Sequence, residues 1–192
     1  ETVRQATPDD KLVIAGTGCE STWATIDLTI QAAEAGADVA LVIAPGFYDS
    51  KMSPAALVRH YNAVADASPV PVMLYNMPKY THVDMAATTI ARAAEHPNVI
   101  GIKDSSGNIT KLADIVRLTG AADRGGTFQV LAGSAGFLFA ALAVGAVGGV
   151  VALSNIAPHQ CIDIYQLFYA GRWDDAADLQ RRMVPVNTAI TA

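Results

Sequence analysis

Lys103 follows a short apolar run, a position where its amine could act as a nucleophile. Residues 99–102 are mostly β-branched and too few for a helix, which predicts a buried strand with Lys103 at its carboxyl end. In parallel α/β proteins the active site lies at that end of the strands. A lysine partly removed from water there is more readily neutral, and the neutral amine attacks a ketone to form a Schiff base. The alternative interpretation is a lysine that extends its charged head into water.

Polar residues also stand at the ends of the other predicted strands. In chain order they are Thr17, Tyr48, Tyr75, Ser134, Ser154 and Asn155. Tyr75 closes the strand before that of Lys103, so in a parallel barrel it would lie beside the lysine and act as acid or base on the reacting hydroxyl. Its alternative role is a half-buried packing tyrosine with a solvated hydroxyl.

The elements that must position these residues alternate between strand and helix along the whole chain. Apolar runs predict strands at 12–15, 39–44, 70–75, 99–102, 128–132 and 149–153. Helices are predicted at about 23–35, 54–67, 85–95, 109–118, 135–145 and 158–170, with a last helix from 173. This alternation fits either a doubly wound sheet or part of a (β/α)₈ barrel. The chain has no Gly-x-Gly-x-x-Gly motif and no P-loop, which argues against a dinucleotide or nucleotide site.

The composition favours small-molecule chemistry. The chain has 192 residues, of which 52% are hydrophobic and 16% charged, as in an α/β enzyme with one domain. A net charge of −5 without a block of Lys or Arg argues against nucleic acid and against a membrane surface as partners. The two cysteines are widely separated, which predicts free thiols in a reducing compartment. The four histidines are dispersed, so surface positions are expected and no metal site is predicted.

A long uncharged stretch raises the question of a membrane span. Residues 135–153 are almost entirely apolar, which is long enough to cross a bilayer. Four glycines interrupt this stretch, at Gly136, Gly145, Gly148 and Gly149. We therefore expect a strand, a helix and a second strand of a buried βαβ unit.

Four motifs resemble one known family. They are Gly-Thr-Gly-Cys-Glu-Ser-Thr at 16–22, Tyr-Asn-Met-Pro at 75–78, Gly-Ile-Lys-Asp-Ser at 101–105 and Leu-Ala-Gly-Ser at 131–134. In this order they resemble the dihydrodipicolinate synthase / N-acetylneuraminate lyase family of class I pyruvate aldolases, and most closely its 4-hydroxy-2-oxoglutarate aldolase branch. The resemblance implies a (β/α)₈ barrel, a carbon–carbon lyase activity without cofactor or metal, and a homotetramer.

The resemblance also implies roles for individual residues. Lys103 would form the Schiff base with the C2 carbonyl of the 2-oxo acid, and Tyr75 would take the proton of the C4 hydroxyl during cleavage. Tyr48 matches the family tyrosine that reaches across a subunit interface into a proton relay, although it can equally be a loop aromatic that covers the barrel mouth. The residues expected near the substrate are Gly133 and Ser134 on its carboxylate side, with Ser154 or Asn155.

The sequence departs from the family pattern in two ways. Dihydrodipicolinate synthases carry an arginine two positions after Tyr-Asn-x-Pro, where this chain has Tyr80, and a phenol does not replace a guanidinium fork. Tyr80 and Thr81 would instead help to select the aldehyde. The family's first two βα units and its last helices have no counterpart in residues 1–192, so we expect one partial barrel domain that carries strands 3 to 8 of the barrel.

The leading hypothesis is a class I aldolase that cleaves a 4-hydroxy-2-oxo acid to pyruvate and an aldehyde such as glyoxylate. Alternatives are a 2-keto-3-deoxy sugar-acid aldolase, a dihydrodipicolinate synthase-like enzyme, or an inactive barrel fragment. The expected location is intracellular, in the cytoplasm or the mitochondrial matrix.

Overall fold

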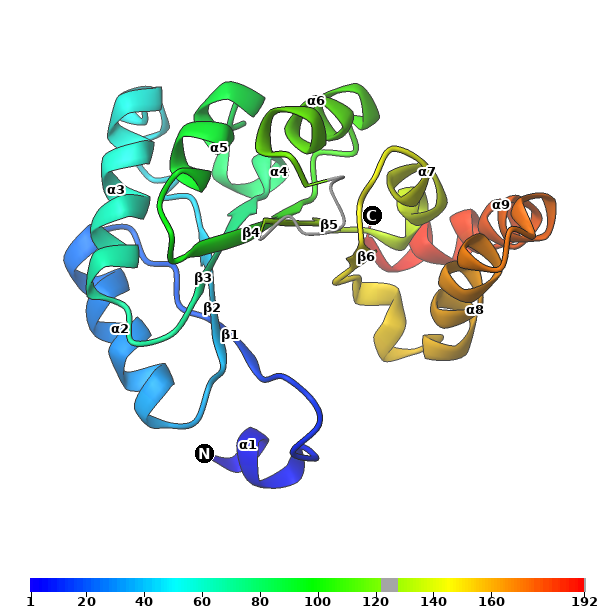
Figure 1. The fold of residues 1–192 in the computed structure, drawn as a ribbon, viewed down its shortest axis with the longest axis horizontal. Helices are drawn as coiled ribbons and strands as arrows, with labels where there is room; N and C mark the ends of the chain where they lie inside the picture. Colours follow the sequence, from blue (N-terminus) through cyan, green and yellow to red (C-terminus); the bar gives the residue numbers. More distant parts are fainter. Residues whose placement is uncertain (122–127, 192) are drawn as a thin grey trace. The chain divides into compact units, whose positions relative to one another are not determined.

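A computed structural model describes residues 1–121 and 128–191, and six strands follow one another in sequence order in its sheet (Figure 1). Residues 1–102 and 103–192 form two compact units, and each is described by itself. The strands are β1 (Ile14–Gly16), β2 (Val39–Ile43), β3 (Val72–Asn76), β4 (Val99–Asp104), β5 (Gln129–Ala132) and β6 (Gly148–Gly149). The boundary between the units falls within β4.

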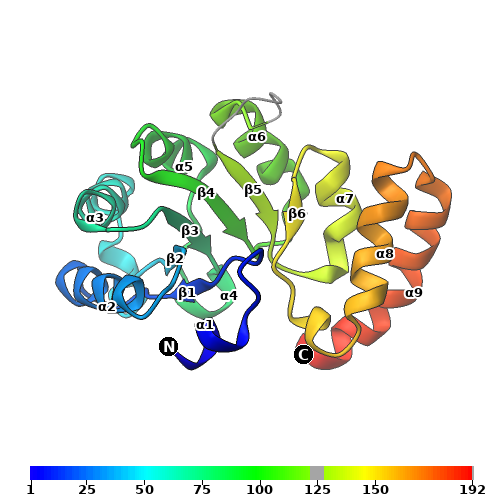
Figure 2. The ribbon, with the colours of Figure 1, turned by 60° about the horizontal axis from the view of Figure 1, so that its bottom comes forward.

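The first unit packs helices against parallel strands. Its helical segments are α1 (Thr2–Ala6), α2 (Thr22–Glu34), η1 (Asp49–Lys51), α3 (Pro54–Ala67), α4 (Pro78–Thr81) and α5 (Ala87–Ala94). In β2 and β3, Ala40 pairs with Val72 and Ile43 pairs with Tyr75. Figure 2 shows α2, α3 and α5 on the outer side of these strands. Apolar side chains such as Val42, Leu74 and Ile90 are fully buried, as expected for a parallel sheet covered by helices.

Local chemistry explains where the helices begin. Ser53 caps α3, because its Oγ accepts a hydrogen bond from Ala56 N (3.2 Å) and Pro54 occupies the first helical turn. Ser21 caps α2 in the same way, through Ala24 N at 3.1 Å.

The second unit contains the end of β4, β5, β6 and the remaining helices. These are α6 (Ile109–Thr119), η2 (Ala135–Phe137), α7 (Leu138–Ala143), η3 (Ala152–Asn155), α8 (Pro158–Tyr169) and α9 (Trp173–Thr191). Gly133 N donates to Asp104 O (2.8 Å), and β6 pairs in parallel with β5. Helices α8 and α9 lie side by side in both views (Figures 1 and 2). Ile115, Leu138 and Ile164 contribute to the buried core of this unit.

The structure corrects several expectations. The sixth strand contains only Gly148–Gly149, and Ser154 and Asn155 lie in η3. Their side chains donate to nearby carbonyls, Ser154 Oγ to Val151 O (2.7 Å) and Asn155 Nδ2 to Ala152 O (3.0 Å), which favours a local turn over a strand. Helices α1 and α4 were not predicted.

The apolar stretch 135–153 forms short elements, as expected, but they are η2, α7, β6 and the start of η3. The first strand of the predicted βαβ unit, β5, ends at Ala132, before the stretch begins. Within the described part of the chain, none of the helices is both long enough and apolar enough to cross a membrane. The prediction of surface histidines is wrong for His60, which is buried in α3.

Candidate active site

Lys103 lies within β4, one residue before its end. The neighbouring side chains of Ile102 and Asp104 are fully buried, whereas Lys103 is partly buried. Since successive side chains of a strand point to opposite faces, Lys103 lies on the face opposite to Ile102 and Asp104. The strand therefore fixes the backbone of the lysine rigidly and leaves its side chain partly accessible.

Asp104 organises the loop that follows the lysine. Its Oδ1 accepts hydrogen bonds from Ser106 N (2.9 Å) and from Ser106 Oγ, so Asp104 caps the turn that follows the strand. Its Oδ2 forms an ion pair with Lys111 Nζ (3.3 Å), and both side chains are almost completely buried. Lys111 is thus committed to a buried carboxylate, and its ammonium is not presented to a substrate carbonyl.

The junction between β4 and β5 requires a glycine. A Cβ at Gly133 would overlap Ser105 Oγ and lie 2.8 Å from the Asp104 carbonyl oxygen. Ser105 Oγ is buried and has no hydrogen-bond partner among residues 1–121 and 128–191. The sequence did not single out this hydroxyl as a candidate, although its position two residues after Lys103 was a signal. A buried hydroxyl without a partner is available to a bound polar group.

Ser134, next to Gly133, is held by a distant helix. Its Oγ accepts from Gly136 N (3.2 Å) and from Asn187 Nδ2 (3.2 Å), and Asn187 belongs to α9. Gln180 of the same helix bonds the backbone at the first residue of η2 and in the first turn of α7. Neither Gln180 nor Asn187 was predicted as a site residue, because neither lies near a motif in the sequence.

In the first unit, Tyr75 is the penultimate residue of β3 and is partly buried. Its carbonyl oxygen accepts from Ala44 N (3.3 Å), which ties it to the end of β2. The next residue, Asn76, is fully buried, and it donates to Asp84 Oδ1 (2.9 Å) and accepts from Met85 N (3.0 Å). The asparagine of the Tyr-Asn-x-Pro motif therefore fixes the loop that leaves the tyrosine strand.

Tyr48 lies in an exposed loop whose backbone is bound by the carboxylate of Glu20. The residue is 66% exposed, and its ring makes an edge contact with the ring of Phe47, with centroids 5.0 Å apart. Glu20 accepts hydrogen bonds from Gly46 N (3.1 Å) and Phe47 N (2.8 Å). The glutamate of the Gly-Cys-Glu-Ser-Thr motif thus holds the loop that presents Tyr48.

The remaining candidates of the first unit differ in accessibility. Tyr80 is exposed, and Lys79 Nζ lies 5.6 Å from the centroid of its ring. Thr81 is buried, and its hydroxyl bonds the backbone at Met77 and Val83. Thr17 is also buried, and its Oγ1 accepts from Thr29 Oγ1 (2.8 Å). Tyr80 is therefore better placed to meet a substrate than Thr81 or Thr17.

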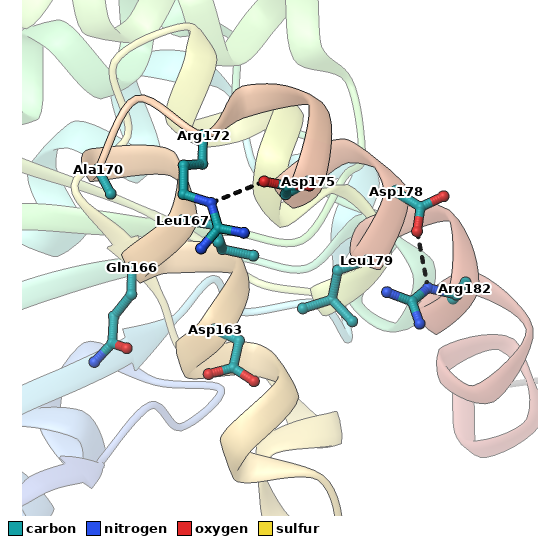
Figure 3. A pocket seen from close by; sticks show the side chains of 9 residues that line it. All are labelled: Asp163, Gln166, Leu167, Ala170, Arg172, Asp175, Asp178, Leu179 and Arg182. Carbon is teal, nitrogen blue, oxygen red and sulfur yellow. Dashed lines mark hydrogen bonds and ion pairs between the residues drawn. The ribbon is translucent and has the colours of Figure 1, made fainter.

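The second unit contains two hollows. A groove of about 560 Å³ runs between α8 and α9, where Arg172 pairs with Asp175 (2.8 Å) and Arg182 with Asp178 (3.1 Å), as Figure 3 shows. An apolar hollow of about 310 Å³ includes Ser154 in its lining. Lys103 lines neither of them.

Comparison with known proteins gives a consistent result. Residues 1–192 match the dihydrodipicolinate synthetase family. The chain is 42% identical over 169 residues to a protein of Emericella nidulans named probable 4-hydroxy-2-oxoglutarate aldolase, mitochondrial, and covers 53% of it with 88% of its own length. It is 38% identical over 181 residues to 4-hydroxy-tetrahydrodipicolinate synthase of Methanothrix thermoacetophila, covering 59% of that protein with 94% of its own length.

Solved structures show the same relationship. Dihydrodipicolinate synthase of Thermotoga maritima has a TM-score of 0.89 at 30% identity, with 96% of this chain and 61% of that chain covered. A prophage protein of the dihydrodipicolinic acid synthase family from E. coli K12, in complex with pyruvate, has a TM-score of 0.88 at 31% identity and the same coverage. These likenesses confirm the predicted fold class, an α/β chain whose six parallel strands are part of a (β/α)₈ barrel. The chain spans little more than half the length of these relatives.

Proposed function

The chain belongs to the dihydrodipicolinate synthetase family of pyruvate-dependent class I aldolases, and from this we propose that Lys103 is the residue that forms the Schiff base. The observation that carries the proposal is the position of Lys103, partly buried near the carboxyl end of β4 within the Gly-Ile-Lys-Asp-Ser motif. Lys111, the neighbouring lysine of the second unit, is engaged by the buried Asp104.

The proposed reaction is the cleavage of a 4-hydroxy-2-oxo acid. Lys103 Nζ adds to the C2 carbonyl, and loss of water gives an iminium. Tyr75 takes the proton of the C4 hydroxyl, the C3–C4 bond breaks, and its electron pair moves into the iminium to give an enamine. The aldehyde leaves, C3 of the enamine is protonated, and water hydrolyses the resulting imine to pyruvate and the free amine.

The choice of substrate rests on one residue and one relative. Tyr80 occupies the position of the arginine expected in dihydrodipicolinate synthases, and it is exposed enough to meet a ligand. The Emericella relative is named as an aldolase of 4-hydroxy-2-oxoglutarate. We therefore place a 4-hydroxy-2-oxo acid that releases glyoxylate ahead of a 2-keto-3-deoxy sugar acid or the dihydrodipicolinate synthase substrates.

The remaining site roles and partners are part of the same proposal. Gly133 and Ser134, with Ser154 or Asn155, would lie towards the substrate carboxylate, and Tyr80 and Thr81 towards the aldehyde. Tyr48 would enter the proton relay of a neighbouring subunit in a homotetramer. The partner is a small 2-oxo acid, and the compartment is the cytoplasm or the mitochondrial matrix.

The proposal is tested by trapping with pyruvate and borohydride, which reduces an imine to a stable amine. We expect the intact mass of the folded chain to increase by one reduced pyruvate, and we expect no increase in Lys103→Ala. Lys111→Ala is the matched control and should still be trapped. A folded chain that gains no adduct would support the inactive-fragment alternative.

A further inference from the structure

Helix α9 presents two buried amide side chains to the loop that follows β5. Gln180 and Asn187 are only 8% and 7% exposed. They are seven residues apart, which is close to two helical turns, so they lie on the same face of α9. Both side chains bond residues in the segment 134–139, which leads from β5 through η2 into α7.

Gln180 fixes the backbone of this loop at two points. Its Nε2 donates to Ala135 O (2.7 Å), and its Oε1 accepts from Phe139 N (3.0 Å). The amide side chain thus bridges the beginning of η2 and the first turn of α7. Because Gln180 holds the backbone that directly follows Ser134, helix α9 also fixes the position of Ser134.

Asn187 controls the direction of the Ser134 hydroxyl. Ser134 Oγ accepts from Gly136 N and from Asn187 Nδ2, both at 3.2 Å, so its two lone pairs are engaged. Its hydrogen remains, and the acceptor for it is Asn187 Oδ1 at 3.4 Å. This distance is long for a bond between a hydroxyl and an oxygen, where about 2.8 Å is usual. Because Ser134 Oγ accepts two hydrogen bonds and donates only a long one, its hydrogen can be donated to a stronger acceptor, such as a carboxylate.

We propose that Asn187 is a positioning residue, which orients the hydroxyl of Ser134 as a hydrogen-bond donor to the carboxylate of the 2-oxo acid. Ser134 is partly exposed and follows Gly133, whose amide is bonded to the end of the lysine strand. The carboxylate adjoins the carbonyl that Lys103 attacks, so this inference rests on the proposed function. It adds that α9, 53 residues further along the chain, determines how the carboxylate is recognised.

The test compares two carbonyl compounds of similar size in borohydride trapping. Pyruvate carries the carboxylate, and hydroxyacetone carries a neutral hydroxymethyl group in its place. Asn187→Asp puts a carboxylate beside Ser134 that takes up its hydrogen and repels the bound anion. We expect the pyruvate concentration for half-maximal trapping to rise about tenfold, while the value for hydroxyacetone changes by less than about twofold.

Two further variants make the result decisive. Thr188→Asp adds the same charge at the next, exposed position of α9 and should leave both values unchanged. Asn187→Ala removes the amide without adding charge and, if Asn187→Asp does not fold, should still weaken trapping by pyruvate selectively. Equal losses for both carbonyl compounds in a folded variant would overturn the inference. Failure of the unmodified chain to form any adduct would instead overturn the proposed function.

Discussion

Two lysines in the second unit are eight residues apart, and their surroundings differ in the way that matters for Schiff-base chemistry. Lys111 is nearly buried, and Asp104, a fully buried carboxylate, pairs with its ammonium. Lys103 is on the opposite face of β4 from Asp104 and is partly accessible. The side chain of Lys111 is held against this buried carboxylate, so the geometry favours Lys103 over Lys111 as the residue that meets a substrate.

If Tyr75 acts only on the C4 hydroxyl, its loss should slow carbon–carbon bond cleavage without preventing formation of the Schiff base. Tyr75→Phe keeps the ring but removes the hydroxyl that takes the proton from the C4 hydroxyl. We expect pyruvate trapping on Lys103 to be retained and retro-aldol turnover, measured as pyruvate release, to fall by about 10²–10⁴-fold. A variant that loses trapping but keeps turnover would contradict the assigned roles.

Gly133 is expected to be intolerant of a side chain. In Gly133→Ala the added Cβ would overlap Ser105 Oγ and press on the Asp104 carbonyl. We expect the free energy of unfolding, measured by urea titration, to fall by about 1–3 kcal/mol. Gly148→Ala is the matched control, because its nearest contact would be 3.8 Å away. Equal stability of the two variants would show that the junction has room.

His60 should make the first unit sensitive to acid. Its Nδ1 lies 2.9 Å from Thr22 Oγ1, its Nε2 is buried without a partner among the described residues, and burial lowers its pKa. In the unfolded chain the imidazole of His60 takes up a proton near its usual pKa of about 6.5, whereas in the folded chain it does so only at lower pH. The free energy of unfolding therefore decreases as the pH falls below about 6.5, until the pKa of the folded chain is passed.

His60→Gln is expected to reduce the loss of unfolding free energy between pH 7 and pH 5, measured by denaturant titration at each pH. His159→Gln, at an exposed position, is the control and should keep the loss seen in the unmodified chain. An unchanged pH dependence in His60→Gln would show that this histidine does not carry the effect.

The sequence predicted the residues whose signals are local and missed those that depend on distant contacts. The caps formed by Asp104 and Ser53, for example, bond neighbours within three residues, a spacing that is visible in the sequence. Gln180 and Asn187 bond residues 41 to 53 positions away, and Glu20 bonds a loop 26 and 27 positions away. Such pairs follow from tertiary packing, which one sequence does not display.

Among the secondary structure elements, strands and helices with strong periodic patterns were predicted to within two or three residues. Strand β6 was not, because two glycines have little strand propensity. The side chains of Ser154 and Asn155 also bond the carbonyls three residues before them, which favours a turn. Short α4 was missed because Pro78 marks either a turn or a helix start, and the pattern of four residues does not distinguish them.

We expect the loop after β2, which carries Tyr48, to depend on Glu20 for its order. Glu20 is the acceptor for the amides of Gly46 and Phe47, so Glu20→Ala should make these amides exchange hydrogen several-fold faster in hydrogen–deuterium exchange. Glu34→Ala, at an exposed position of α2, is the control. Unchanged exchange at both amides would mean that other contacts hold the loop of Tyr48.

At the scale of the molecule, the alternation of strands and helices left two architectures open, and the four motifs decided in favour of the barrel. The likeness to solved family structures agrees with that choice, with TM-scores of 0.88 and 0.89 over 60% or more of each chain. A parallel sheet needs covering on both faces, so the choice of barrel also explains why uncharged residues fill the stretch 135–153.

The central claim is that one amine among five lysines reacts with a 2-oxo acid. The most direct measurement is to trap the folded chain with pyruvate and borohydride, digest it, and locate the adduct by peptide mass spectrometry. We predict that the adduct is on Lys103 and absent from Lys11, Lys51, Lys79 and Lys111. An adduct on Lys111, or one distributed equally over the five lysines, would contradict the account.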